Sequence, residues 1–214
     1  MKTNYEYRAA ARETLNGHWN EVVLMSVILF GLAILFCAPQ ALSGLESLAG
    51  IFGSAYFVAL ILLIGPLEYA FFNVLLLMIR DRLDGRTHVK AMLRLYELDF
   101  TRSVPALLLS FLIIALISIP TLCIGGIILS YSYKMVPLLL HDYPELSTRE
   151  VLRTSREMMR GHKWDLFLLE LSFLGWVLLS ILTLGIGLLW LTPYIYAAEA
   201  HFYEDLKAET IVEE

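Results

Sequence analysis

Several polar side chains of this sequence stand inside long apolar segments, where a charge is costly. They are Glu68, Asn73, Lys134, Glu170, Glu199 and His201. Glu68 follows Gly65-Pro66 and precedes Arg80 by twelve residues, so a helical rise of 1.5 Å per residue places it about 18 Å from that basic end. A charge at the bilayer centre costs about 2.5 to 3.5 kcal/mol. We therefore expect Glu68 to face water or a partner, as in the broken-helix sites of transporters, or to be protonated and hydrogen-bonded to another helix.

Lys134, Glu170 and Glu199 form a second candidate group. Each is six or seven residues from a polar loop residue, which corresponds to a depth of roughly 10 Å in a helix. Opposite charges at the same depth predict a buried cluster of Lys134 with Glu170 or Glu199, with Asn73 and His201 as further members. The alternative is that Lys134 extends its ammonium group to the interface alone.

A basic amphipathic helix is expected to begin at the Ser147-x-x-Glu150 capping box and to run through Arg160. One face of this helix carries Val151, Leu152, Ser155, Met158 and Met159, and another carries Arg149, Arg153, Arg156 and Arg160. This pattern is typical of a helix lying on anionic lipid of the inner leaflet. Packing on the ends of a helix bundle, with solvated arginines, explains it equally well. Trp19 and Trp164 are expected to be interfacial anchors.

No enzymatic motif is present in the sequence. It has no H-E-x-x-H helix, no G-x-S-x-G elbow and no Walker loop, and its five histidines show no metal-ligand spacing. We therefore predict no catalytic residue, metal or cofactor. The net charge of -5 derives largely from the C-terminal residues and indicates no nucleic-acid partner. A bridge between Cys37 and Cys123 is conceivable, although apolar filling is the favoured role for two isolated cysteines.

The elements that carry these residues are predicted to be transmembrane helices. Of the 214 residues, 58% are hydrophobic and 17% are charged, and the mean hydropathy is +0.66, which indicates an all-α polytopic membrane protein. The apolar runs are Val22 to Ala38, Leu48 to Ile79, Val104 to Leu140 and Leu166 to Phe202. A bilayer core takes about 20 helical residues. The last two runs are interrupted by Pro120 with Gly125-Gly126 and by Gly185 with Gly187, so six helices in three hairpins are expected.

Charge placement predicts the topology. The sixteen lysines and arginines form four clusters, which are the three up to Arg12, the six from Arg80 to Arg102, the six from Lys134 to Lys163, and Lys207, and none lies in the intervening turns. The positive-inside rule then puts every basic cluster and both termini in the cytoplasm. We expect the membrane to be the plasma (inner) membrane. We expect one membrane domain over residues 1–214.

An internal repeat is expected from two similar segments. "ARETLNGHW" at Ala11 to Trp19 resembles "SREMMRGHKW" at Ser155 to Trp164. The middle copy lacks the Gly-His pair. Units of 1–82, 83–146 and 147–214 would form a pseudo-threefold bundle, and chance similarity between amphipathic segments is the alternative.

The last third of the chain resembles a known family. The residues that carry the resemblance are Ser155, Arg156, Gly161, Lys163, Trp164, Leu171-Ser172-Phe173, Gly175-Trp176, Thr183, Gly185, Gly187, Pro193-Tyr194, Ala200 and Phe202-Tyr203. Together with "SYSYKMVPLLLHDYPELS", they resemble the bacterial integral membrane proteins of the domain-of-unknown-function family 975, from about Val104 to Leu206. The resemblance brings no activity with it. More remotely, the chain is similar to the membrane anchors of some glycerophosphodiester phosphodiesterases, which hints at a lipid-linked role.

These observations favour a non-enzymatic membrane protein that binds or organises lipid or a membrane partner, which could be a second copy of the chain. A small solute or ion transporter or channel using Glu68 and the group of Lys134, Glu170 and Glu199 is the alternative, and an intramembrane lipid enzyme comes third. A water-accessible cavity reaching Glu68 would favour transport. Acidic side chains enclosed in a packed bundle would favour the protein that binds or organises lipid or a membrane partner.

Overall fold

The computed structural model describes residues 1–42, 46–81, 88–118 and 124–212, and every regular element in these ranges is a helix. The predicted all-α class is confirmed. The helices in chain order are α1 (Asn4–Leu15), α2 (Trp19–Leu42), α3 (Glu46–Ile79), α4 (His88–Ser118), α5 (Ile124–Ser132), α6 (Val136–Asp142), α7 (Thr148–Met158), α8 (Lys163–Leu171), α9 (Leu174–Leu182) and α10 (Leu188–Val212). Cys123 and the side chain of Cys37 lie outside the described residues, so the proposed bridge is untested.

The expected turn between α9 and α10 is present. Gly185 adopts φ +85°, a conformation that glycine reaches without steric cost. Gly187 then passes so close to α9 that an added Cβ would lie 2.7 Å from the Ser180 hydroxyl oxygen. Gly126 of α5 approaches Ser118 of α4 in the same way, so small residues close both hairpins.

Two predicted continuous helices are divided into shorter ones. The helix expected from Leu166 is broken between α8 and α9, where the Ser172 hydroxyl donates to the Leu169 carbonyl at 2.7 Å. Such a bond from serine back to its own helix often bends the helix. The helix expected before Leu140 divides into α5 and α6, and Pro137 in the first turn of α6 has no N–H with which to continue the helical ladder.

The segments α1–α2 and α7–α8 are built alike. Each first helix begins with a capping box, formed by Thr3 with Glu6 and by Ser147 with Glu150. Each ends before a glycine of positive φ, +84° at Gly17 and +94° at Gly161. The chain turns by 99° between α1 and α2. In both segments, residues spaced four apart are buried. They are Tyr7, Ala11 and Leu15 in α1, and Val151, Ser155 and the C-cap residue Met159 in and directly after α7.

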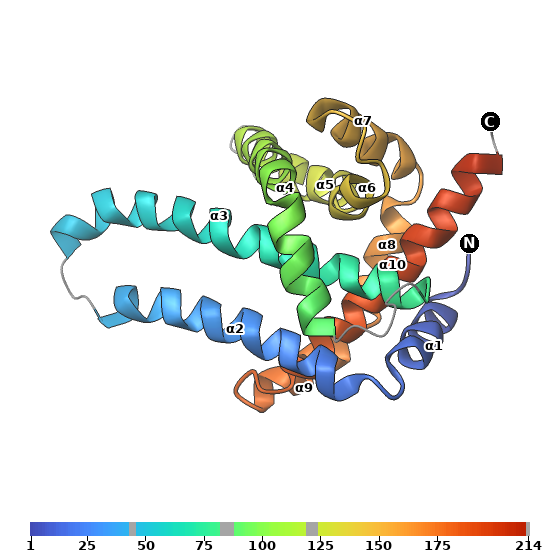
Figure 1. Ribbon diagram of the computed structural model, residues 1–214, viewed down its shortest axis with the longest axis horizontal. Coiled ribbons are helices and arrows are strands. Elements are labelled where there is room, and N and C mark those ends of the chain that lie inside the picture. The colour runs from blue at the N-terminus through green and yellow to red at the C-terminus, as the bar shows by residue number, and fades with distance from the viewer. Residues whose placement is uncertain (43–45, 82–87, 119–123, 213–214) are drawn as a thin grey trace.

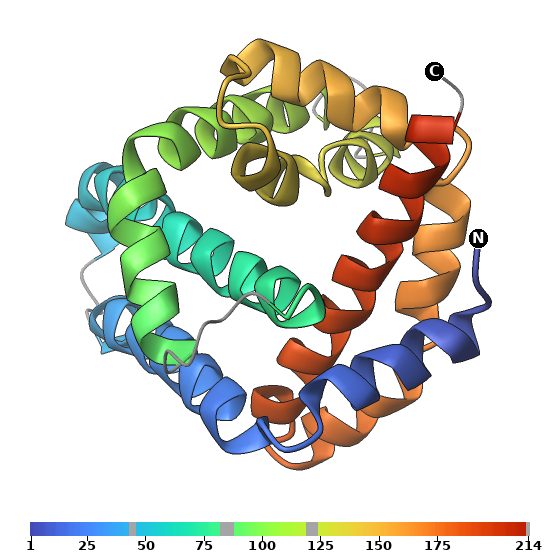
Figure 2. The same cartoon turned by 45° about the vertical axis from the view of Figure 1, so that its right-hand side comes forward.

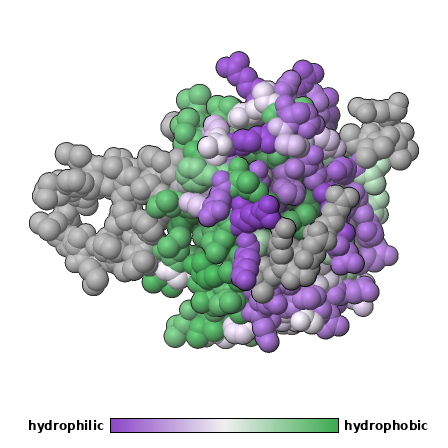
Figure 3. Space-filling view, in the orientation of Figure 1, coloured by the Kyte–Doolittle hydropathy of each residue, from purple (hydrophilic) through white to green (hydrophobic). Residues whose placement is uncertain are grey.

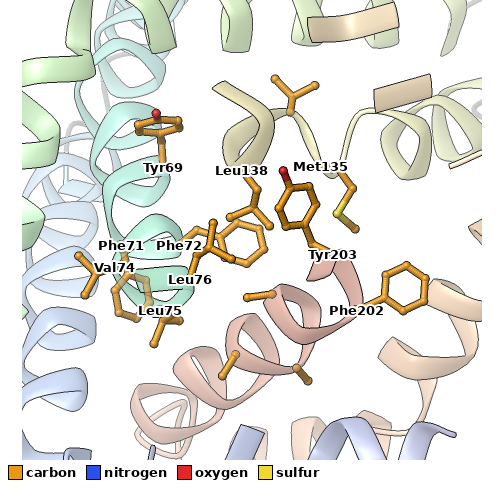
Figure 4. Packing of buried hydrophobic residues seen from close by; sticks show 14 of the residues in the cluster. Tyr69, Phe71, Phe72, Val74, Leu75, Leu76, Met135, Leu138, Phe202 and Tyr203 are labelled. Carbon is orange, nitrogen blue, oxygen red and sulfur yellow. The ribbon is translucent and has the colours of Figure 1, made fainter. Parts of the chain in front are cut away.

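The core lies where α3, α6 and α10 meet (Figure 4). Helix α3 contributes buried residues from Leu67 to Leu76, and α10 contributes Ala197, Ala198, Ala200, Phe202 and Tyr203. Helices α4, α7 and α1 lie around this core (Figure 2). Helix α4 packs on α2 and α3, α7 packs on α4, α5 and α6, and α1 packs on α10.

A broad apolar surface adjoins a polar side. In the described residues, His88–Ser118 and Lys163–Leu182 are long and apolar enough to span a membrane, and the bent pair of Asn4–Leu15 and Trp19–Ile34 is a third candidate. Only 17% and 22% of the first two apolar windows are buried, so most of their side chains point outward. Figure 3 shows these hydrophobic residues beside a hydrophilic side, and both termini lie toward that side (Figure 1). The count of six crossings stays a prediction.

Candidate functional site

Lys134 joins three parts of the fold. It lies in the turn between α5 and α6, and its Nζ is 3.0 Å from Glu170 Oε1 of α8 and 2.9 Å from Glu199 Oε1 of α10. The Tyr131 hydroxyl donates to Glu170 Oε2 at 2.6 Å. Lys134 therefore contacts both acids, where the sequence predicted Glu170 or Glu199, and it does not reach the interface alone.

Glu199 is the deepest member of this group. Its side chain is 1% exposed. Although Oε1 lies near Lys134, neither carboxylate oxygen accepts a hydrogen bond of acceptable geometry from a described residue. A buried carboxylate usually accepts several hydrogen bonds. Glu199 thus retains unused acceptor capacity.

A cavity of about 290 Å³ connects this group with Glu68. We call it the inner cavity, and it lies between α3, α4, α10 and the α5–α6 turn. Its polar lining residues are Glu68, Ser110, Ser130, Lys134 and Glu199, and its aromatic lining residues are Tyr69, Phe72, Tyr133 and Tyr196. Glu68 is exposed and accepts a hydrogen bond from the Tyr196 hydroxyl. Glu68 thus contacts another helix, α10, through this hydrogen bond, and its side chain is also exposed.

Asn73 and His201 are not brought into this group. Asn73 Nδ2 donates to the carbonyls of Tyr69 and Pro137, at 3.0 and 3.2 Å, and so links α3 to α6. The His201 ring contacts the Thr14 hydroxyl of α1 at 2.9 Å. The reason is helical geometry, because two residues rotate the helix by about 200° and turn His201 away from the face that carries Glu199.

The apolar face predicted for α7 is buried against the protein. Val151, Leu152, Ser155, Met158 and Met159 are all buried, and the Ser155 hydroxyl donates to the Ser132 carbonyl at 2.8 Å. This corrects the expectation that the face lies in lipid. The helix packs on the bundle, which is the alternative that the pattern left open.

Helix α7 ends at Met158, two residues before the expected end, so three of the four arginines (Arg149, Arg153 and Arg156) lie in α7 and Arg160 follows it. All four are exposed and line one cavity of about 500 Å³. We call it the arginine cavity, and its remaining walls are Leu109, Ile113, Tyr133, Leu152 and Glu157. Arg156 donates to the Tyr133 hydroxyl at 3.0 Å, and Arg153 pairs with Glu157 at 2.9 Å. Within the described residues, Arg149 and Arg160 form no ion pair. The cavity therefore has an excess of positive charge.

Sequence reasoning missed an ion network around Asp142. This side chain is 4% exposed and accepts hydrogen bonds from Arg80, Tyr203 and Lys207 at 2.7, 2.8 and 2.7 Å. Burial raises the pKa of Asp142, but these hydrogen bonds outweigh it and hold the pKa well below its usual range. Arg80 also contacts Glu204 at 2.6 Å. The sequence signals that could have revealed this network are Arg80, directly after the second apolar run, and Asp142, just after the third.

The two predicted anchors differ in environment. Trp164 is 65% exposed and stacks on Phe167 with ring centroids 5.0 Å apart. Trp19 is half-buried and lines an apolar cavity of about 420 Å³ together with Arg12, Trp176 and Trp190. Among the described residues, no group of three or more His, Cys, Asp or Glu could hold a metal ion.

Comparison with curated proteins and with solved structures gave no significant match. The comparison with protein families gave one, over residues 106–210, which is nearly half of the chain. The matched region contains the arginine helix α7 together with Lys134, Glu170 and Glu199. By this match residues 106–210 belong to the family described as "Protein of unknown function (DUF975)".

Proposed function

We propose that the chain is a multi-pass protein of the plasma (inner) membrane with six crossings and both termini in the cytoplasm. The polar side that holds both termini, α1 and α7 supports this topology. The equal spacing of caps, glycines and buried residues in α1–α2 and α7–α8 supports the internal repeat. So does the order of packing, since α1, α4 and α7 each pack on the hairpin of another repeat unit.

We further propose that the protein binds an anionic phospholipid headgroup in the arginine cavity. The observation that carries this proposal is that four arginines and two apolar residues of α4 line one cavity. Guanidinium groups bind phosphate through paired, charge-assisted hydrogen bonds. Arg149 and Arg160 are not engaged with any described carboxylate, so they can contact a phosphate without first breaking an ion pair.

The apolar wall favours a lipid over a soluble phosphate compound. Leu109 and Ile113 lie on the face of α4 that meets the cavity, and Leu112 and Leu116 of the same helix are 54% and 72% exposed. A phosphate held by the arginines would therefore direct its acyl chains along the outward surface of α4. Basic pockets beside membrane helices bind lipid headgroups in this way.

The test is a titration of the full-length protein with phosphatidylglycerol and with phosphatidylcholine, followed by native mass spectrometry. The double variant Arg149→Gln/Arg160→Gln should bind phosphatidylglycerol about 30-fold more weakly, because each basic residue near anionic lipid contributes about 1 kcal/mol. Binding of phosphatidylcholine should not change.

The matched control is Lys90→Gln/Arg94→Gln, which removes the same charge from exposed positions of α4 outside the cavity. This control should keep the affinity of the unsubstituted protein. Equal losses in both double variants would refute a localised site and indicate general electrostatic attraction. Glycerol 3-phosphate that competes as well as the lipid would refute the role of the apolar wall.

A second candidate function is transport of a small solute, and the inner cavity favours it. The cavity brings Glu68, Lys134 and Glu199 to one space, and intramembrane ionisable residues that line a shared space are typical of solute pathways. Its test is solute uptake by proteoliposomes. A protein that retains phosphatidylglycerol binding but moves no solute would refute transport, and lipid binding would be the remaining function.

A further inference from the structure

The charges around the inner cavity do not balance. Glu68 and Glu199 line it, and Glu170 contacts the cavity residue Lys134. Lys134 is the one cation among the described residues that contacts any of these three carboxylates. Lys134 must also divide its single charge between Glu170 and Glu199. A buried carboxylate without sufficient positive charge nearby is unfavourable, so the site is incomplete without a proton or a further cation.

The geometry points to a binding site for a small organic ammonium ion in the inner cavity, with Glu199 and Glu68 as its carboxylate partners. This inference deepens the second candidate function by naming a ligand class, but it concerns binding and holds whether or not the ligand crosses the membrane. It does not depend on the lipid proposal.

Glu199 provides the first contact. It is 1% exposed, lines the cavity and has an Oε2 that accepts no hydrogen bond from a described residue. An ammonium N–H donor would satisfy this oxygen with a charge-assisted hydrogen bond. Glu68, which is exposed and lines the same cavity, would attract the same cation as it enters.

The aromatic lining suits an organic cation. Tyr69, Phe72, Tyr133 and Tyr196 all contribute to the cavity wall, and the faces of aromatic rings attract cations, most strongly where water is excluded. A metal ion fits less well, because no described group of three His, Cys, Asp or Glu could coordinate one. The volume of about 290 Å³ is at the lower end for ligand pockets, which restricts the ligand to small molecules.

Equilibrium binding of n-butylammonium to the full chain in phosphatidylcholine nanodiscs tests the inference, with n-butanol and butyrate as neutral and anionic probes of the same length. Isothermal titration should show saturable binding of butylammonium alone. Glu199→Gln and Glu68→Gln should each weaken that binding at least tenfold, because each removes one negative charge. Glu209→Gln is the control, since Glu209 is exposed and does not line the cavity.

Lys134→Gln supplies a readout that a purely structural role would not give. Lys134 competes with the ligand for Glu199, so its removal should strengthen butylammonium binding by severalfold, provided that the variant elutes as a folded protein. Should this variant fail to fold, Glu199→Gln with its control decides the matter.

Absence of saturable butylammonium binding to the folded protein would overturn the inference, as would equal affinity in Glu199→Gln. A protonated carboxyl band in the infrared spectrum that disappears in Glu199→Gln, together with no binding, would show that a proton completes the site instead. Binding without uptake by proteoliposomes would retain the site and reject the transport function.

Discussion

Replacing Asp142 with asparagine should destabilise the protein more than any other single removal of charge at its polar side. Asp142 is 4% exposed and accepts hydrogen bonds from Arg80, Tyr203 and Lys207, which link α6 to the residue after α3 and to α10. Asparagine keeps the shape and one acceptor oxygen but removes the charge. Two cations then lose their shared partner.

The expected loss is about 2 to 3 kcal/mol. Breaking a fully buried ion pair costs about 3 to 5 kcal/mol, but this case calls for a lower value for two reasons. Arg80 keeps its contact with Glu204, and the Lys207 side chain is 25% exposed and can be hydrated. The free energy of unfolding would be measured by sodium dodecyl sulfate titration in mixed micelles, with tryptophan fluorescence as the signal.

The pH dependence gives an independent check on the sign. The pKa of Asp142 is lowered in the folded state, so its contribution to stability is complete above the unfolded-state pKa of about 3.9 and is lost as the pH falls toward the folded-state pKa. The difference between the unsubstituted protein and Asp142→Asn should therefore shrink by about 1.3 kcal/mol between pH 7 and pH 3.

Asp81→Asn is the matched control. Asp81 is exposed and has φ +51°, a conformation that asparagine also tolerates. This variant removes the same charge near the same end of α3 and should cost little. The reasoning is refuted if Asp142→Asn is no less stable than Asp81→Asn at pH 7, or if the difference between Asp142→Asn and the unsubstituted protein grows on acidification.

Two further predictions concern local structure. Ser147→Ala removes the side-chain half of the α7 capping box and should cost about 1 kcal/mol, seen as roughly fivefold faster amide exchange in the first turn of α7, with α1 as the unaffected internal control. Gly187→Ala should destabilise the α9–α10 hairpin by about 1 to 3 kcal/mol, because the new Cβ would lie 3.0 Å from the Ser180 backbone. In the sodium dodecyl sulfate titration, the control Gly31→Ala should be neutral or slightly stabilising, because its Cβ meets open space. Equal effects of the two substitutions would contradict the close approach of Gly187 to Ser180.

The sequence by itself determined the local structure. Capping residues fixed the start of α7, and the spacing of Val151, Ser155 and Met159 fixed its buried face, because both depend on contacts within a few residues. Gly185 identified the final turn for the same reason. The pairing of Lys134 with Glu170 and Glu199 could also be predicted, since charges at equal depth in an apolar environment have few other partners.

Only the tertiary structure decided what each face meets. The apolar stripe of α7 fits a lipid surface and a protein surface equally well, and the packing of α4, α5 and α6 chose the protein. The same packing placed the arginines over Leu109 and Ile113, and it brought Asp142 to Arg80 and Lys207 from distant parts of the chain. Periodicity gives the direction of a side chain about its own helix, whereas the neighbour that it meets depends on how the helices pack.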